Sequence, residues 1–214
     1  MKKLINHFRY AIYLIVFAGF VSAHAGSYDE FFAAIKRDHP SMMKGLLAQG
    51  FDPNTVDEVG SPGLVFALRI ESYEVASVLM DSPKLLVNAA NPQGETALMM
   101  ACLRAQPALA HRLVQRGAAI NRDGWSPLHY AAAGEDERMV AWLLQRGAAV
   151  NATAPNGNTP LMMAAQTGAS ASVEMLLAKG ADVNRLNLIN LSAADIAEQA
   201  GRDNLAQRLR QQMR

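Results

Sequence analysis

The side chains that could do chemistry in this 214-residue sequence are a single cysteine, five histidines and eleven methionines. Cys102 lies among small apolar residues in the segment TALMMACLRA, where a thiol packs as a small hydrophobe and is shielded from reaction. His39 and His111 have no second ligand at the spacing of a zinc site. The sequence contains no nucleophile, phosphate-binding or zinc-protease motif. It therefore predicts no catalytic activity, no cofactor and no bound zinc.

The methionine pairs are the main argument for a metal-binding function. They occur at Met42–Met43, Met99–Met100 and Met162–Met163, and thioether sulfurs are soft ligands that suit Cu(I). A copper site needs two or three sulfurs that converge, however, and adjacent residues on one helix point in different directions. Core packing by flexible side chains explains the pairs better, and a copper or small-ligand binder is the alternative function.

The first 25 residues, MKKLINHFRYAIYLIVFAGFVSAHA, contain the parts of an export signal in order. Two lysines and an arginine form a basic start, an apolar stretch covers residues 10–21, and Ala23-His24-Ala25 forms a small-residue cleavage site before Gly26. The apolar stretch is shorter than the roughly 20 residues of a membrane-spanning helix. We expect cleavage and a location in the periplasm; secretion or an uncleaved membrane anchor is the alternative.

Charge argues against nucleic acid as a partner. Cleavage would remove three of the 20 basic residues and no acidic residue, which leaves 17 against 19 and a net charge of about −2. Phosphate binding needs a basic stripe, and the sequence has none. A lone cysteine cannot form an internal disulfide, so stability must come from packing. We expect a monomer with no membrane contact once the signal is removed.

The elements that position these residues recur along the chain. Similar sequence segments each end in an asparagine, and these asparagines are spaced by 34, 33, 30 and 33 residues. They are Asn54, Asn88, Asn121, Asn151 and Asn184. A period near 33 is typical of stacked helical units. The predicted units are residues 28–54, 55–88, 89–121, 122–151, 152–184 and 185–214, within a domain that covers residues 26–214.

One unit can be built from residues 124–151, GWSPLHYAAAGEDERMVAWLLQRGAAVN. Ser126 is a good N-cap, and Pro127 suits the first position of a helix. Small and apolar residues at helical spacing then predict a first helix, and MVAWLL predicts a second one that Gly147 ends in the left-handed conformation. Each unit is therefore predicted as two short antiparallel helices followed by an extended segment.

These motifs resemble the ankyrin repeat, whose unit carries G-x-T-P-L-H-x-A, a V-x-x-L-L helix and G-A-D-V-N. Residues 126–131 match the first motif almost fully, and Gly180–Asn184 match the last one completely. The resemblance covers about residues 28–214 and implies an all-α solenoid of about six repeats, including terminal caps, with short β-hairpin loops. It also implies a non-catalytic scaffold that binds another protein through hairpin tips and first helices.

The repeats depart from this pattern at three places. Repeat one lacks the T-P-L-H element and reads as the two helices of a terminal cap. Repeat two has Pro62-Gly63-Leu64 at that element and DSPKLL where a glycine usually ends the second helix. Alignment of Gly124 with Gly94 and Gly157 places a three-residue deletion at the hairpin tip of repeat four. We therefore expect one shorter tip in the array.

His129 occupies the histidine position of the motif. The same alignment places Met99 and Met162 at this position in repeats three and five. We expect a ring nitrogen of His129 to bond backbone and hydroxyl groups around the first helical turn. The methionine pairs then recur because the unit recurs.

The predicted binding surface consists of hairpin tips and the ends of first helices. Most tip residues are polar, but Trp125 places a large ring on the shortened tip, and Leu188 and Ile189 stand where the family usually has polar residues. Large exposed side chains of this kind are typical anchors. Alternatively, Trp125 covers its own repeat and the leucines close the C-terminal end of the stack. The candidate site residues are Arg122, Asp123, Trp125, Gln93, Glu95, Arg104, Asn156, Asn158, Gln166, Leu188 and Ile189.

Overall fold

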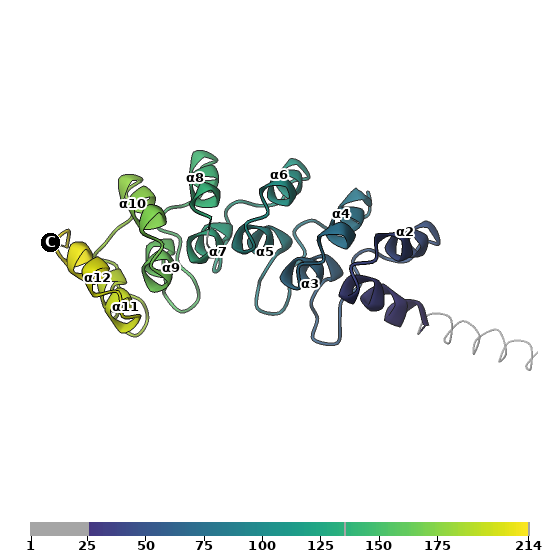
Figure 1. The fold of residues 1–214 in the computed structure, drawn as a ribbon, viewed down its shortest axis with the longest axis horizontal. Coiled ribbons are helices and arrows are strands. Elements are labelled where there is room, and N and C mark those ends of the chain that lie inside the picture. Colours follow the sequence, from purple (N-terminus) through teal and green to yellow (C-terminus); the bar gives the residue numbers. More distant parts are fainter. Residues whose placement is uncertain (1–25, 135, 214) are drawn as a thin grey trace, which may run out of the picture.

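Short helices arranged in two rows make up the fold. In the computed structural model, which describes residues 26–134 and 136–213, one row holds the first helix of every repeat and the other row holds the second helix (Figure 1). The predicted export signal lies outside the described residues. The first helices are residues 26–36, α3 (Gly63–Arg69), α5 (Ala97–Leu103), α7 (Pro127–Ala133), α9 (Pro160–Thr167) and α11 (Ala193–Gln199). The second helices are α2 (Pro40–Ala48), α4 (Tyr73–Asp81), α6 (Pro107–Gln115), α8 (Glu137–Gln145), α10 (Ser170–Ala178) and α12 (Asp203–Arg210).

The helix boundaries follow the capping residues of the sequence. The hydroxyls of Thr96, Thr159 and Ser192 accept the N–H three residues further on, at 3.5, 3.4 and 3.2 Å, which satisfies a donor that would otherwise have no partner in the helix. Helix α7 begins at Pro127 after Ser126, as predicted. Gly147 follows α8 with a φ of +79°, so the predicted left-handed stop is also confirmed.

The core runs between the two rows without interruption. The second residue of four first helices is a leucine that is at most 3% exposed, and each of these helices packs between the first helices of neighbouring repeats. Cys102 is 1% exposed on α5, and burial raises the pKa of its thiol. The prediction that it is a buried small residue is confirmed. The four leucines are Leu64, Leu98, Leu128 and Leu161.

The asparagines that revealed the period tie each repeat to the next one. In Asn54, Asn88, Asn121 and Asn151, Nδ2 donates to a backbone carbonyl of the following repeat at 2.8–3.0 Å. The Oδ1 atom of the same side chain accepts a backbone N–H two residues beyond that carbonyl, at 2.7–2.8 Å. Each amide therefore satisfies two backbone groups at a junction between repeats, which explains why the residue type recurs.

Hairpin tips project from the first-helix row, away from the second helices (Figure 1). In repeats two, three, five and six a backbone bond of 2.8–3.0 Å closes each tip, with Gly60, Gly94, Gly157 and Asn190 as donors. Repeats two and three add isolated antiparallel bridges, and no strand forms within the described residues. In repeat four the described chain reaches α7 without such a turn, which confirms the shorter tip.

The irregular start of repeat two is explained by its neighbour. A Cβ atom at Gly63 would stand 2.6 Å from the ring of Phe31, which is fully buried in the first helix of repeat one. Glycine therefore stands where other repeats have proline or alanine because the cap places an aromatic ring there. Repeat one itself consists of two helices, as predicted.

Candidate protein-binding surface

We call the surface formed by the hairpin tips and the exposed sides of the first helices the tip face. Of the predicted site residues, Trp125, Arg122, Glu95 and Asn158 are half-buried. The exposed members are Asp123, Gln93, Arg104, Asn156, Gln166, Leu188 and Ile189. Bonds join Asn156 to Asn158 and to Leu188, and Arg122 and Asp123 line one cavity.

Trp125 lies over its own repeat. Its ring meets the rings of His129 and Tyr130 edge-on, with centroid distances of 5.4 and 5.9 Å and interplanar angles of 79° and 76°, a geometry that aromatic quadrupoles favour. Because the ring is only half-buried, one part packs on the repeat and another part remains accessible. Trp125 is therefore held in place before any partner arrives.

Glu95 is the centre of a polar network within the tip face. Its carboxylate accepts bonds from Arg69 Nη2 at 2.6 Å, from Asn91 Nδ2 at 2.6 Å and from the Tyr130 hydroxyl at 2.8 Å. Burial and the Glu95 carboxylate both raise the pKa of Tyr130. Glu95 thus connects repeats two, three and four, and its charge is used inside the chain. The predicted tip residue Glu95 therefore also joins neighbouring repeats.

Two further predicted residues also make contacts between repeats. Arg104 donates to the carbonyl of Arg69 at 2.9 Å and pairs with Glu71 at 3.1 Å. Asn158 accepts a bond from Asn187 Nδ2 at 2.9 Å. These bonds fix the positions of Arg104 and Asn158, although Arg104 is exposed and Asn158 is half-buried.

His129 is fully buried and joins repeats four and five. The Ser126 N–H donates to Nδ1 at 3.2 Å, so this nitrogen carries no proton. Nε2 therefore carries the proton and donates it to the carbonyl of Asn158 at 3.1 Å. The prediction of local backbone and hydroxyl partners is confirmed, since the Ser126 hydroxyl also lies 2.8 Å from Nδ1. Burial lowers the pKa of the ring and favours its neutral form.

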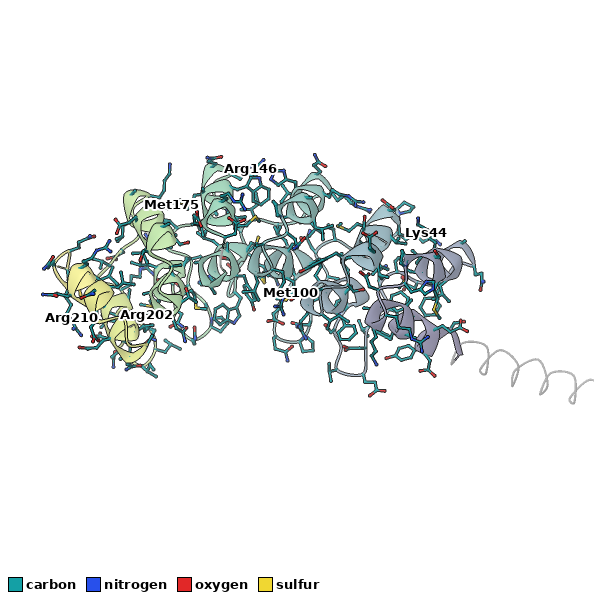
Figure 2. The ribbon with its side chains drawn as sticks, in the orientation of Figure 1. Lys44, Met100, Arg146, Met175, Arg202 and Arg210 are labelled. Atoms are coloured by element: carbon teal, nitrogen blue, oxygen red, sulfur yellow. The ribbon has the colours of Figure 1, made fainter. Side chains whose placement is uncertain are left out.

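Methionine replaces His129 in the neighbouring repeats. Met99 Sδ accepts the Thr96 N–H at 3.5 Å, and Met162 Sδ accepts the Thr159 N–H at 3.4 Å. Both side chains are at most 1% exposed. Figure 2 shows Met100 in the first-helix row, with Met175 and Arg146 in the second-helix row. The burial and bonding of Met99 and Met162 support core packing as the reason for the methionine pairs.

We predict that His129 makes folding sensitive to acid. The folded-state pKa is lowered, so its contribution to stability is complete above the unfolded pKa of about 6.5 and is lost as the pH falls below that value. His129→Met places the side chain of repeats three and five at this position. Urea unfolding between pH 7.5 and 5 should show a steeper loss for the wild type than for His129→Met. Parallel curves would contradict a neutral buried imidazole.

Leu188 and Ile189 remain outside the core. They are 75% and 72% exposed, on a tip that Asn187 holds by accepting the N–H groups of Ile189 and Leu191 at 3.1 and 3.0 Å. The Leu188 N–H also donates to the carbonyl of Asn156 at 3.1 Å. The alternative in which Leu188 closes the C-terminal end of the stack is therefore wrong.

A cavity of about 530 Å³ lies between repeats four and five, beside the shortened tip. Arg122 and Asp123 line it together with Thr153. Two of the predicted site residues therefore lie in one hollow of the tip face, next to the shortened tip.

Sequence reasoning missed two aromatic clusters. Tyr28, Phe32 and Phe66 line a cavity at the N-terminal end of the tip face; the four-residue spacing of Tyr28 and Phe32 on one helix was the available signal. On the second-helix row, Trp142 stacks on His111 with centroids 4.7 Å apart, and the guanidinium of Arg146 lies 4.4 Å from the centroid of the Trp142 ring.

Residues 26–134 and 136–213 contain no group of three or more histidine, cysteine, aspartate or glutamate side chains placed to hold a metal ion. Among the same residues, no helix has the length and apolar character needed to cross a membrane.

Paired short helices with projecting tips define a helical-repeat solenoid. A family profile described as "Ankyrin repeats (3 copies)" matches residues 31–123 and 103–187. The chain belongs to the ankyrin-repeat family.

Relatives with similar repeats are much longer proteins. The chain is 28% identical over 182 residues to Protein glp-1 of Caenorhabditis elegans, which covers 78% of the chain and 14% of that protein. It is 32% identical over 111 residues to Ankyrin repeat and SAM domain-containing protein 6 of Rattus norvegicus, covering 50% and 12%. It is 44% identical over 94 residues to Neurogenic locus notch homolog protein 4 of Homo sapiens, covering 42% and 5%. The chain therefore corresponds to a small part of each of these proteins.

Proposed function

We propose that this protein is a non-catalytic scaffold that binds another protein through its tip face. The observation that carries this proposal is that Trp125 is held half-exposed while Leu188 and Ile189 are exposed on a fixed tip. Large side chains that are fixed before binding lose little conformational entropy in a complex. The repeat array supplies an extended surface that suits such contacts.

The relatives support the kind of module and not a particular activity. Each of the three proteins contains a stretch similar to this chain within a much longer sequence. We infer that the module, a stack of repeats that presents a binding surface, is what they share with this chain.

We also propose that the protein acts in the periplasm. The basic start, the apolar stretch and the small-residue cleavage site in residues 1–25 support export. The partner should therefore be sought in the exported fraction, with a membrane-tethered array as the alternative state of the same scaffold.

Trp125→Ala should weaken the binding of a partner captured from the exported fraction by about 2 kcal/mol or more, which is a factor of about 30. Arg138→Ala is the matched control, because its side chain is 84% exposed on α8 in the second-helix row. Affinity should be measured by calorimetry well below the melting temperature of each variant.

Two results would count against this use of the tip face. One is an equal loss of affinity in Trp125→Ala and Arg138→Ala. The other is a lower melting temperature for Trp125→Ala with unchanged affinity, since the ring also packs on His129 and Tyr130.

A further inference from the structure

A cavity of about 300 Å³ opens at the N-terminal end of the tip face. It lies between helical residues 26–36, the repeat-two tip and α3, so three separate segments form its walls. Its lining combines aromatic rings with carboxylates.

Three rings form a continuous aromatic wall. The centroids of Tyr28 and Phe32 are 4.9 Å apart, and those of Phe32 and Phe66 are 6.0 Å apart with an interplanar angle of 63°. Tyr28 and Phe66 are half-buried, whereas Phe32 is only 6% exposed. The rings therefore offer accessible surface while their positions are fixed by contact with one another.

The charged residues of the lining are predominantly acidic. Asp29, Asp57 and Glu58 face a single cation, Lys36. None of these four side chains forms an ion pair with another residue in the described part of the chain. Burial raises the pKa of the Tyr28 hydroxyl, and the negative charges of Glu58, Asp57 and Asp29 raise it further.

One of these carboxylates is partly committed to the fold. Asp57 Oδ1 accepts the N–H groups of Val59 and Ser61 at 3.1 and 2.7 Å. Asp57 is therefore needed to shape the tip, whereas the carboxylates of Asp29 and Glu58 form no hydrogen bond or ion pair within the described residues. These two residues are the ones to change in a test.

We propose that this cavity binds the ammonium or guanidinium group of a lysine or arginine side chain in a basic segment of a partner protein. Ring faces attract cations within about 6 Å of their centroids, and the unpaired carboxylates add complementary charge. The methylene groups of such a side chain can pack on the apolar rings while its head reaches the acids. This inference rests on the proposed use of the tip face and adds the chemistry of one contact.

The probe is the peptide acetyl-Gly-Arg-Lys-Arg-Gly-amide, titrated into the full chain and followed by NMR chemical shifts. The peptide should shift the resonances of Tyr28, Phe66 and Val59, and binding should weaken as salt is added. The neutral peptide acetyl-Gly-Gln-Gln-Gln-Gly-amide should bind at least about 10-fold more weakly.

Two sets of variants measure separately how much the carboxylates and the aromatic rings contribute to peptide binding. Asp29→Asn combined with Glu58→Gln should weaken peptide binding about 5-fold or more, while Glu74→Gln, an exposed carboxylate on α4, should leave it unchanged. Tyr28→Leu should weaken binding about 3-fold or more, and Tyr28→Phe, which keeps the ring, should stay within about 2-fold of the wild type.

Several outcomes would overturn the proposal. They are equal binding of the neutral peptide, no effect of the Asp29 and Glu58 changes, and no difference between the two Tyr28 variants. Tighter peptide binding after Lys2, Lys3 and Arg9 are changed to glutamine would assign the cavity to the chain's own N-terminal segment. If the peptide does not bind but partner capture still depends on Trp125, this inference alone is rejected. If the peptide binds as expected but partner capture does not depend on Trp125, the proposed Trp125 contact alone is rejected.

Discussion

Replacement of Leu161 by alanine is expected to lower the free energy of unfolding by about 2–5 kcal/mol. Leu161 is 1% exposed on α9, and α9 packs against α7 on one side and α11 on the other. The loss of its side chain would open a cavity at a junction of three repeats. Because each repeat is held mainly by its neighbours, the helices cannot close this cavity without disturbing two interfaces.

Chemical denaturation of the wild type and the variant measures this effect. Leu188→Ala is the control, because Leu188 is 75% exposed and its truncation should change stability by less than about 0.5 kcal/mol. A loss of well under about 1 kcal/mol for Leu161→Ala would show that Leu161 is not part of the inter-repeat core.

Features that depend on neighbours in the sequence could be predicted. The start of α7 after Ser126 and the end of α8 before Gly147 follow from capping and backbone preferences that act over a few residues. The shortened tip of repeat four could be located because the glycines of three repeats align. These signals are local, so they can be recognised in the sequence without knowledge of the packing.

Contacts between repeats could not be predicted in the same way. Glu95 was interpreted as a tip residue, but its carboxylate receives donors from Arg69 and Tyr130, which lie 26 and 35 residues away. The ring of Phe31 leaves no room for a side chain at position 63 of the next repeat, which is a glycine. The period places such residues in adjacent units, but it does not say which side chains reach across.

Trp125 shows why the two interpretations of a large tip residue are compatible. The sequence favoured either an anchor for a partner or a cover for the repeat. The ring contacts His129 and Tyr130 and is still half-buried. A side chain can therefore cover its own repeat and be available for binding, because the packing of one part of the ring holds the accessible part in place.

Gly157→Ala is expected to cost about 3 kcal/mol or more, whereas Gly94→Ala should cost only about 1–2 kcal/mol. Both glycines have nearly the same backbone conformation, with φ values of +83° and +80°. The penalty for a side chain in the left-handed region is therefore shared by the two variants. A Cβ at Gly94 would meet no atom within 4 Å.

The space at Gly157 is different because two backbones meet there. A Cβ would stand 2.6 Å from Leu188 N and 2.9 Å from Asn187 Cα, and no side-chain rotation can relieve a contact with backbone. The tips of repeats five and six would have to separate, which would break the Leu188 N–H bond to Asn156 O. Denaturation of both variants gives the difference directly. Equal losses would mean that these two tips are not held against each other, and that Leu188 is presented by its own hairpin alone.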